Sequence, residues 1–385
     1  SPKKFITFDG KQFKSYAQNE GFRINGLPGQ VISFINADSK GRIWIGSRTP
    51  FIDKKFNGGL TKFENGKFSV YDSTNFPLDN ANGFVETPYG DLIFTSAGRN
   101  TQNGEGSYIA LYKNNTFKKI DESEGISLQH ASILPDNISS SIDQDGNTWI
   151  AFLGIIRSSG TDKNSAGVLM YDGNKFHQYK DFIKDFSNDQ IPLSVYYSSQ
   201  LNKVFLTTGV SLSGTFTFKS KSIFEFSDGK WKPSDIIKNI DQIMSAKTGS
   251  QYSDFHFAQT FFIKKNKFIP ELLVLQTTQE SQSQSSKYPD QMFTFKNGQW
   301  EKFDAFSAVP VGNLKDGMIL KTAKGFGFYY PNFSKMLTES DGLLQLRGGI
   351  PIMFSDKNGI VWISYSFSKT PAYAQTYNTG INIWD

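Results

Sequence analysis

The sequence of 385 residues has no cysteine and only three histidines, His130, His177 and His256. Without cysteine the chain has no disulfide, no thiolate metal site and no cysteine nucleophile. None of the histidines lies in a catalytic motif, although His130 and His256 fall in long connectors where an acid or base role is the alternative. We therefore expect no catalytic residues, no metal site and no cofactor.

Long apolar runs are also absent, and charge of one sign is not concentrated. No stretch approaches the roughly 18 apolar residues of a membrane span, so we expect none in this chain. The 41 basic and 36 acidic residues are interspersed, which argues against nucleic acid as a partner. The first residues, Ser1 to Lys4, lack the apolar core of a signal peptide and an initiator methionine, so we expect a trimmed chain.

Aromatic residues and glycine-containing turns are abundant instead. The chain contains 36 Phe, 16 Tyr and 6 Trp, and its 34 glycines fall largely in short polar clusters between apolar runs. This distribution is typical of a chain built from many short strands. The composition therefore predicts an all-β fold.

One short pattern is a polar turn with glycine followed by an apolar strand. Its clearest copies read Asp-x-x-Gly-x-x-Trp-Ile and begin at Asp38, Asp143 and Asp356. Weaker copies bring the series to seven, centred on Trp44, Phe94, Trp149, Phe205, Val274, Ile319 and Trp362. Because the tryptophans recur at one position, we expect them to pack between repeats rather than to stack on sugars. We expect Asp143 to form a turn rather than a calcium loop.

A second pattern is a strand, a tight turn and a second strand rich in aromatics. The turns are Asn65-Gly66, Asp172-Gly173, Asp228-Gly229 and Asn297-Gly298, with looser copies within 108–120 and 326–337. Asn-Gly and Asp-Gly favour type I′ hairpin turns, in which both central residues need positive φ. Lys113, in a looser copy, is expected to be exposed and of little importance for stability.

Each period thus contains four strands, the content of one blade of a β-propeller. We predict a single domain over 1–385, a seven-bladed β-propeller of four-stranded antiparallel blades. The approximate blades are 22–75, 81–123, 132–183, 191–235, 252–305, 307–338, and 348–385 with 1–18. We expect the N-terminal hairpin and the strand from Gly380 to Asp385 to close the ring, with one strand surplus. Residues 236–244 have helical periodicity and are expected to connect two blades.

The combination of Asp-x-x-Gly-x-x-Trp-Ile with Gly-Leu-x-x-Phe and Asn-Gly-x-Phe resembles the repeat of the two-component regulator propellers. Residues 38–47, 143–151 and 356–364 match this repeat well, and the fourth to sixth copies are degenerate. The resemblance covers nearly the whole chain. It implies a bacterial sensor domain that is periplasmic, or a secreted or cell-envelope protein, with carbohydrate as the usual ligand class. It leaves open whether the chain is an excised ectodomain or a stand-alone propeller.

The connections at the two ends of the predicted blades differ in length. Those at one end are short and uniform, whereas those at the other, such as 47–58, 96–106 and 364–379, are long and varied. Functional residues gather in variable loops on rigid scaffolds. We therefore expect the ligand at the long-loop end, towards blades seven, one, two and three.

Arginine and tyrosine residues of these loops are the candidate ligand contacts. Five of the six arginines map there, and the candidates are Arg23, Arg48, Arg99, Arg157 and Arg347 together with Tyr365 and Tyr373. A guanidinium fork binds carboxylate, phosphate or sugar oxygens in pairs, and aromatic rings suit a saccharide. The alternative is that these residues only anchor the loops.

These features favour a non-catalytic binding or sensory propeller. Its ligand would be a glycan or another anionic or polar small molecule, and another protein is the alternative partner. One competing function is a propeller lyase or glycan-active enzyme of the streptogramin-lyase type, which would need convergent histidines and carboxylates. A protein-docking scaffold is the other.

Overall fold

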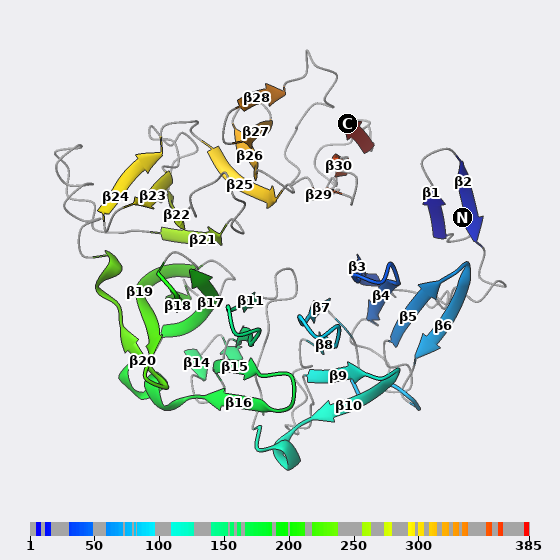
Figure 1. Ribbon diagram of the computed structural model, residues 1–385, viewed down its shortest axis with the longest axis horizontal. Coiled ribbons are helices and arrows are strands. Elements are labelled where there is room, and N and C mark those ends of the chain that lie inside the picture. The colour runs from blue at the N-terminus through cyan, green and yellow to red at the C-terminus, as the bar shows by residue number, and fades with distance from the viewer. Residues whose placement is uncertain are drawn as a thin grey trace. The chain divides into compact units, whose positions relative to one another are not determined.

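In the computed structural model the chain folds into strands joined by turns and short 3-10 helices (Figure 1). The described residues are 5–8, 12–16, 31–48, 59–71, 74–78, 81, 83–96, 109–126, 140–152, 155–157, 160–162, 166–186, 190–198, 201–211, 218–237, 256–262, 273–278, 292–296, 299–303, 308–313, 318–322, 326–330, 333–337, 352–355, 361–364 and 381–384. From residue 256 onward this description covers the backbone alone.

The chain divides into an N-terminal unit, which contains most residues up to Ser234, and a C-terminal unit, which contains Asp235–Asp385. The N-terminal unit begins with a hairpin of β1 (Phe5–Phe8) and β2 (Phe13–Tyr16). Four four-stranded sheets follow it.

Sheet I contains β3 (Val31–Ala37), β4 (Ile43–Arg48), β5 (Gly59–Glu64) and β6 (Lys67–Tyr71). Sheet II contains β7 (Gly83–Glu86), β8 (Leu92–Thr95), β9 (Ile109–Lys113) and β10 (Thr116–Ile120). Sheet III contains β11 (Ser140–Ile142), β12 (Thr148–Phe152), β15 (Gly167–Tyr171) and β16 (Phe176–Tyr179). Sheet IV contains β17 (Gln190–Ser198), β18 (Lys203–Ser211), β19 (Phe218–Ser227) and β20 (Lys230–Pro233).

The C-terminal unit is also built from strands. Two two-stranded sheets pair β21 (His256–Phe262) with β22 (Leu273–Thr278) and β23 (Met292–Lys296) with β24 (Gln299–Phe303). A four-stranded sheet contains β25 (Ala308–Asn313), β26 (Met318–Thr322), β27 (Phe326–Tyr330) and β28 (Phe333–Leu337). A three-stranded sheet contains β29 (Ile352–Ser355), β30 (Val361–Ser364) and β31 (Ile381–Trp384).

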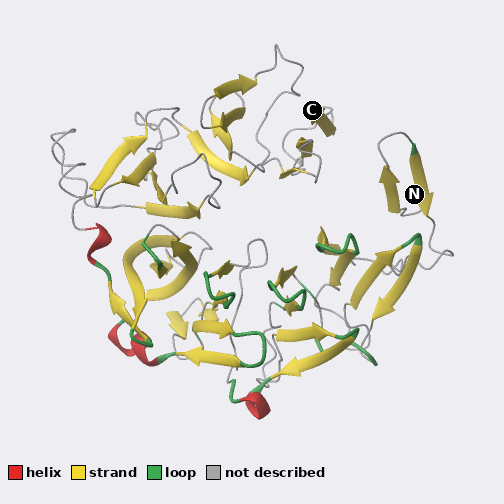
Figure 2. Ribbon diagram, viewed as in Figure 1, coloured by secondary structure: helices red, strands yellow, loops and turns green. Residues whose placement is uncertain are grey.

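The all-β prediction is therefore confirmed, since strands predominate among the described elements (Figure 2). Within each four-stranded sheet the antiparallel strands follow one another in chain order. Of the segment expected to be helical, only a 3-10 turn at Asp235–Ile237 lies within the described residues. The number of blades, their boundaries, the closure of the ring and the single-domain organisation stay predictions.

The registers of the first three sheets define equivalent positions. Ile43 pairs with Phe63 in sheet I, Leu92 with Tyr112 in sheet II, and Thr148 with Tyr171 in sheet III. The next residues, Trp44, Ile93 and Trp149, are therefore equivalent. Sequence alone aligned Phe94 with the tryptophans, which is wrong by one residue. Because strand side chains alternate between faces, Phe94 points to the opposite face from Trp44 and Trp149.

Neighbouring sheets of the N-terminal unit stack through shared apolar clusters. Trp44 packs with residues of sheet II, Ile93 with residues of sheet III and Trp149 with residues of sheet IV. The next residues along the strands lie on the opposite faces. Ile45 packs against the β1–β2 hairpin, Phe94 against sheet I and Ile150 against sheet II. Trp44 and Trp149 are 0% and 2% exposed, which confirms their predicted packing role, whereas the side chain of Trp362 lies outside the described residues.

The β1–β2 hairpin covers the other face of sheet I. Phe5 and Tyr16 form a buried cluster with Ile45 and Phe63. In sheets II and III the residues equivalent to Ile45 contact the preceding sheet. The hairpin therefore takes the position that a preceding blade would occupy.

The hairpin turns agree with the sequence in two cases and differ in a third. Asn65 with Gly66, and Asp228 with Gly229, all have positive φ, as type I′ turns require. At the third predicted turn Asp172 is not a central residue, because its backbone N–H bonds to the carbonyl of Lys175 at 3.2 Å. Gly173 is the first central residue, with φ of 92°, as in a type II′ turn.

Candidate functional site

The two ends of sheets I to III are chemically different. One end, called here the short-turn end, contains the turns at 38–42, 87–91 and 143–147 and the hairpin turns of the same sheets. Strands β4 and β12 start at this end and run to the opposite one, called here the loop end. The connections at the short-turn end are therefore compact turns, as expected from sequence.

Two predicted contact residues are placed at the loop end by the backbone. Arg48 is the last residue of β4, and it pairs with Val31 at the end away from the 38–42 turn. Arg157 lies in β13 (Ile155–Arg157), which forms a hairpin with β14 (Gly160–Asp162) between β12 and β15. Because Phe152 pairs with Gly167 at the loop end of sheet III, this hairpin is inserted at that end. The side chains of both arginines lie outside the described residues, as do Arg23, Arg99, Arg347, Tyr365 and Tyr373.

At the short-turn end, the aspartate of the repeat closes its turn from the inside. In sheet III, Asp143 Oδ1 accepts hydrogen bonds from the backbone N–H groups of Asp145 (3.0 Å) and Asn147 (2.9 Å). Its Oδ2 accepts from the side chains of Asn147 (2.9 Å) and Trp149 (2.8 Å). All four contacts are within the repeat, so the predicted turn role is confirmed.

The same arrangement recurs in sheet I and explains the spacing of the motif. Asp38 accepts from the backbone N–H groups of Lys40 and Arg42, both at 3.0 Å, and from the Arg42 Nε (2.6 Å) and Trp44 Nε1 (2.8 Å) atoms. Six positions separate aspartate from tryptophan in each case, which lets the buried indole N–H find a charged acceptor. Each of these carboxylates accepts four hydrogen bonds within its own repeat and is therefore not available to a ligand.

A polar group at the junction of sheets II and III was missed by the sequence analysis. Lys113 Nζ contacts Asp91 Oδ2 (3.1 Å), the Tyr171 hydroxyl (3.3 Å) and the Gly173 carbonyl (2.9 Å). The hydrogen bonds to Asp91 and Tyr171 raise the pKa of Lys113. Through Tyr171 and Gly173 these contacts join Lys113 of sheet II to sheet III, and the expected small effect of Lys113 on stability stays a prediction.

The histidines show no catalytic arrangement among the described residues. His177 Nε2 lies 2.9 Å from Asp172 Oδ2 in the same hairpin. Burial alone would raise the pKa of Asp172, but hydrogen bonds from His177 and from the backbone N–H groups of Lys175 and Asn174 lower it to about 2. The side chain of His256, which begins β21, and all of His130 lie outside the described residues.

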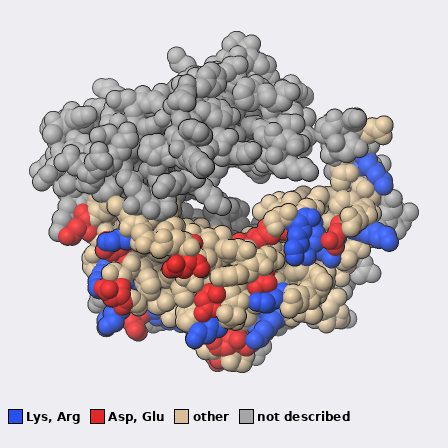
Figure 3. Space-filling model, viewed as in Figure 1, with Lys and Arg blue, Asp and Glu red and all other residues tan. Residues whose placement is uncertain are grey.

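Within the described part of the chain, no three histidine or acidic side chains gather in a way that could hold a metal ion. No described helix is long and apolar enough to cross a membrane. Basic and acidic side chains are interleaved over the visible surface of the N-terminal unit (Figure 3). This interleaving agrees with the pattern of the sequence.

The stacked four-stranded sheets of the N-terminal unit define a propeller-type domain. Residues 26–49, which contain β3, the 38–42 turn and β4, match the family described as two component regulator propeller. The resemblance seen in the repeat is thereby confirmed for this segment. No curated protein matches the chain.

Several solved structures are similar to this chain at low identity. The polysaccharide lyase Uly1 is 10% identical over 93% of this chain and 90% of that one, with a TM-score of 0.48. PorZ, a surface component of the type-IX secretion system of Porphyromonas gingivalis, is 14% identical over 94% of this chain and 41% of that one (TM-score 0.38). YCF48 bound to D1 peptide is 12% identical over 66% and 63% (TM-score 0.31). The chain thus spans less than two thirds of the length of YCF48 and of PorZ.

Proposed function

We propose that this chain is a non-catalytic ligand-binding or sensory module that works in the periplasm or at the cell surface. In this proposal it forms a seven-bladed propeller closed by its terminal strands. The match of residues 26–49 to the two component regulator propeller supports the sensory role and the location outside the cytoplasm. The ligand is a glycan or another anionic small molecule bound at the loop end.

The observation that carries the proposal is the position of Arg48 and Arg157. Arg48 ends β4, and Arg157 lies in the hairpin that follows β12, so both are at the end opposite the short turns. Asp38 and Asp143, at the short-turn end, are used by their own turns. The aspartates of the repeat thus stabilise the turns at one end, and Arg48 and Arg157 stand at the other, where a guanidinium group could contact carboxylate, sulfate or hydroxyl oxygens in pairs.

Binding of acidic and neutral oligosaccharides by isothermal titration calorimetry tests this proposal. We expect an oligogalacturonate or a sulfated oligosaccharide to bind more tightly than a neutral maltooligosaccharide, with affinity that falls as salt rises. Arg48→Ala or Arg157→Ala should weaken binding by ~1–3 kcal/mol, the value of a charge-assisted hydrogen bond. Arg48→Lys keeps the charge but loses the fork, so it should restore binding only in part.

Lys67→Ala is the matched control, because it removes one exposed cation at the short-turn end of sheet I. It should bind like the wild type. Equal binding by the wild type and both arginine variants would contradict the proposed site. Cleaved or unsaturated sugar products in the recovered ligand would instead favour the lyase or glycan-active enzyme.

A further inference from the structure

At the junction of sheets I and II, two positions of sheet I carry cationic side chains, whereas the equivalent positions of sheets II and III do not. Arg42 is equivalent to Asp91 in sheet II and Asn147 in sheet III, and Lys62 is equivalent to Leu111 and Met170. In sheet III a neutral amide completes the aspartate turn and an apolar residue faces the next sheet. The fold of the repeat therefore requires neither positive charge.

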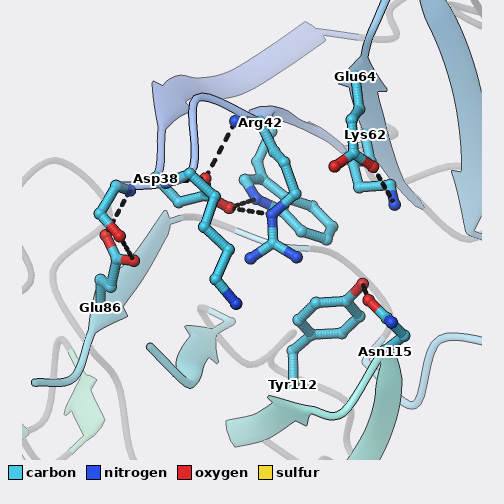
Figure 4. A network of polar contacts seen from close by, with 10 residues as sticks. Asp38, Arg42, Lys62, Glu64, Glu86, Tyr112 and Asn115 are labelled. Carbon is cyan, nitrogen blue, oxygen red and sulfur yellow. Dashed lines mark hydrogen bonds and ion pairs between the residues drawn. The ribbon is translucent and has the colours of Figure 1, made fainter. Parts of the chain in front are cut away.

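Arg42 carries more donors than its turn uses. Its Nε contacts Asp38 at 2.6 Å, as the amide of Asn147 contacts Asp143, and its side chain is only 6% exposed. The terminal Nη2 is buried and has no hydrogen-bond partner among the described residues. The guanidinium carbon lies 5.4 Å from the ring centre of Tyr112 and 5.6 Å from that of Trp44. Figure 4 shows the terminal nitrogens directed away from Asp38, on the side of Tyr112.

Lys62 places a second positive charge in the same region. Its side chain is 13% exposed, and its Nζ lies 2.9 Å from Glu64 Oε2. Burial alone would lower the pKa of Lys62, but the hydrogen bond to Glu64 and the nearby Tyr71 and Tyr112 raise it, so the group is cationic at neutral pH. Burial also raises the pKa of Tyr112, which keeps its hydroxyl protonated. Glu64 balances the charge of Lys62, and Asp38 balances that of Arg42.

We propose that Arg42 and Lys62 bind an oxyanion at the junction of sheets I and II, beside the rings of Tyr71 and Tyr112. The ligand group is a carboxylate, sulfate or phosphate, either as a free ion or on a sugar. One of its oxygens would accept from Arg42 Nη2, which otherwise leaves a buried donor unpaired at a cost in free energy. This site is at the short-turn end and is separate from the site proposed at the loop end.

Sulfate and glucuronate, titrated separately by calorimetry, are the probes, with glucose as the neutral control. Ionic strength is held constant with chloride, so that screening is the same in every sample. We expect saturable binding of an anion to the wild type and none of glucose. Tighter binding of glucuronate than of sulfate would identify an acidic sugar as the source of the anion, and the reverse would identify a free ion.

Arg42→Asn is the informative variant, because Asn147 shows that asparagine completes the same turn. It should keep the urea midpoint close to that of the wild type and bind the anion about ten- to a hundredfold more weakly, the equivalent of one charge-assisted hydrogen bond. Lys62→Met copies sheet III and should also weaken binding. Lys67→Ala, an exposed cation on the neighbouring strand, should not.

Absence of anion binding by the wild type would overturn the proposal and leave a buried water as the partner of Nη2. Unchanged binding by Arg42→Asn would overturn it as well. If Arg42→Asn lost stability, anion binding by Lys62→Met would decide, because this variant leaves the aspartate turn untouched. Unchanged affinity in Lys62→Met would then contradict the site.

Discussion

Sheets I and III build the same turn with different charges. Asp38 and Asp143 each receive two backbone and two side-chain hydrogen bonds, and each binds the indole of the tryptophan six positions later. The remaining donor is the buried guanidinium of Arg42 in sheet I and the half-buried amide of Asn147 in sheet III. Both copies keep the aspartate and the tryptophan of the turn, whereas the residue between them that donates to the aspartate is arginine in one copy and asparagine in the other. A residue that differs between copies in this way is not required for the turn and is available for a binding role.

The largest expected effect is the difference between Asp38→Ala and Asp143→Ala. Asp38→Ala leaves the buried Arg42 without its carboxylate and should lower the free energy of unfolding by ~3–5 kcal/mol. Asp143→Ala leaves only neutral donors and backbone N–H groups unpaired, which should cost ~1–3 kcal/mol. Urea midpoints measured side by side test the order. Equal losses would mean that the charge of Arg42 is better solvated than its exposure indicates.

Alanine in place of Gly173 and of Gly66 compares the hairpins of sheets III and I. Both glycines have positive φ, so each alanine pays about 1 kcal/mol of backbone strain. A Cβ on Gly173 would also lie 2.6 Å from the Tyr89 ring, whereas nothing lies within 4 Å of one on Gly66. We expect a further ~1–3 kcal/mol at Gly173 from overpacking.

The double variant Gly173→Ala with Tyr89→Ala separates the backbone strain from the clash with the Tyr89 ring. It should recover the part of the loss that is caused by the ring and keep the strain. If the loss stayed the same with and without the ring, the contact of Tyr89 with sheet III would not matter for stability.

Lys113 should be more important than an exposed lysine of sheet I. Lys113→Met removes the contacts with Asp91 and the Gly173 carbonyl and should cost about 1 kcal/mol, a small value because the side chain is 41% exposed. Lys67→Ala, at the start of β6, should change the unfolding free energy by less than about 0.5 kcal/mol. Thermal unfolding of the two variants tests the difference, and equal midpoints would agree with the small effect expected from sequence.

Asp172 should also make the stability of the sheet III hairpin depend on pH. Its pKa is about 2 in the folded chain and roughly 4 when unfolded. Since the folded pKa is the lower one, its stabilisation is complete above pH 4 and disappears as the pH falls through 2. The difference in urea midpoint between wild type and Asp172→Asn should therefore shrink over this window. A difference that is constant from pH 4 to pH 2 would contradict the assignment.

The sequence predicted the strands well because their signals are local. Alternating apolar residues and turns such as Asn65-Gly66 specify hairpins without tertiary information. The sequence also predicted that Trp44 and Trp149 are buried. It misplaced Phe94 by one residue because Ile93 and Phe94 are both apolar, and only the pairing of Leu92 with Tyr112 shows which of them faces sheet III.

The candidate site was harder to predict because contacts between sheets involve residues far apart in the chain. Lys113 and Tyr171 are 58 positions apart, and nothing near Lys113 in the sequence indicates their contact. Arg42 could have been found, since an arginine stands where the third copy of the motif has asparagine. The arginines of the long loops were chosen from loop length, from their clustering in these loops and from the aromatic residues beside them, and the backbone places Arg48 and Arg157 at the loop end.

Backbone hydrogen exchange, followed by mass spectrometry with and without an acidic oligosaccharide, tests most directly whether the loop end binds the ligand. If the ligand binds there, exchange should slow in peptides that follow β4 and β12, the 87–91 and 143–147 turns should not change, and the sugar should be recovered intact. Protection confined to those turns, or recovery of cleaved sugar, would contradict a non-catalytic binding site at the loop end.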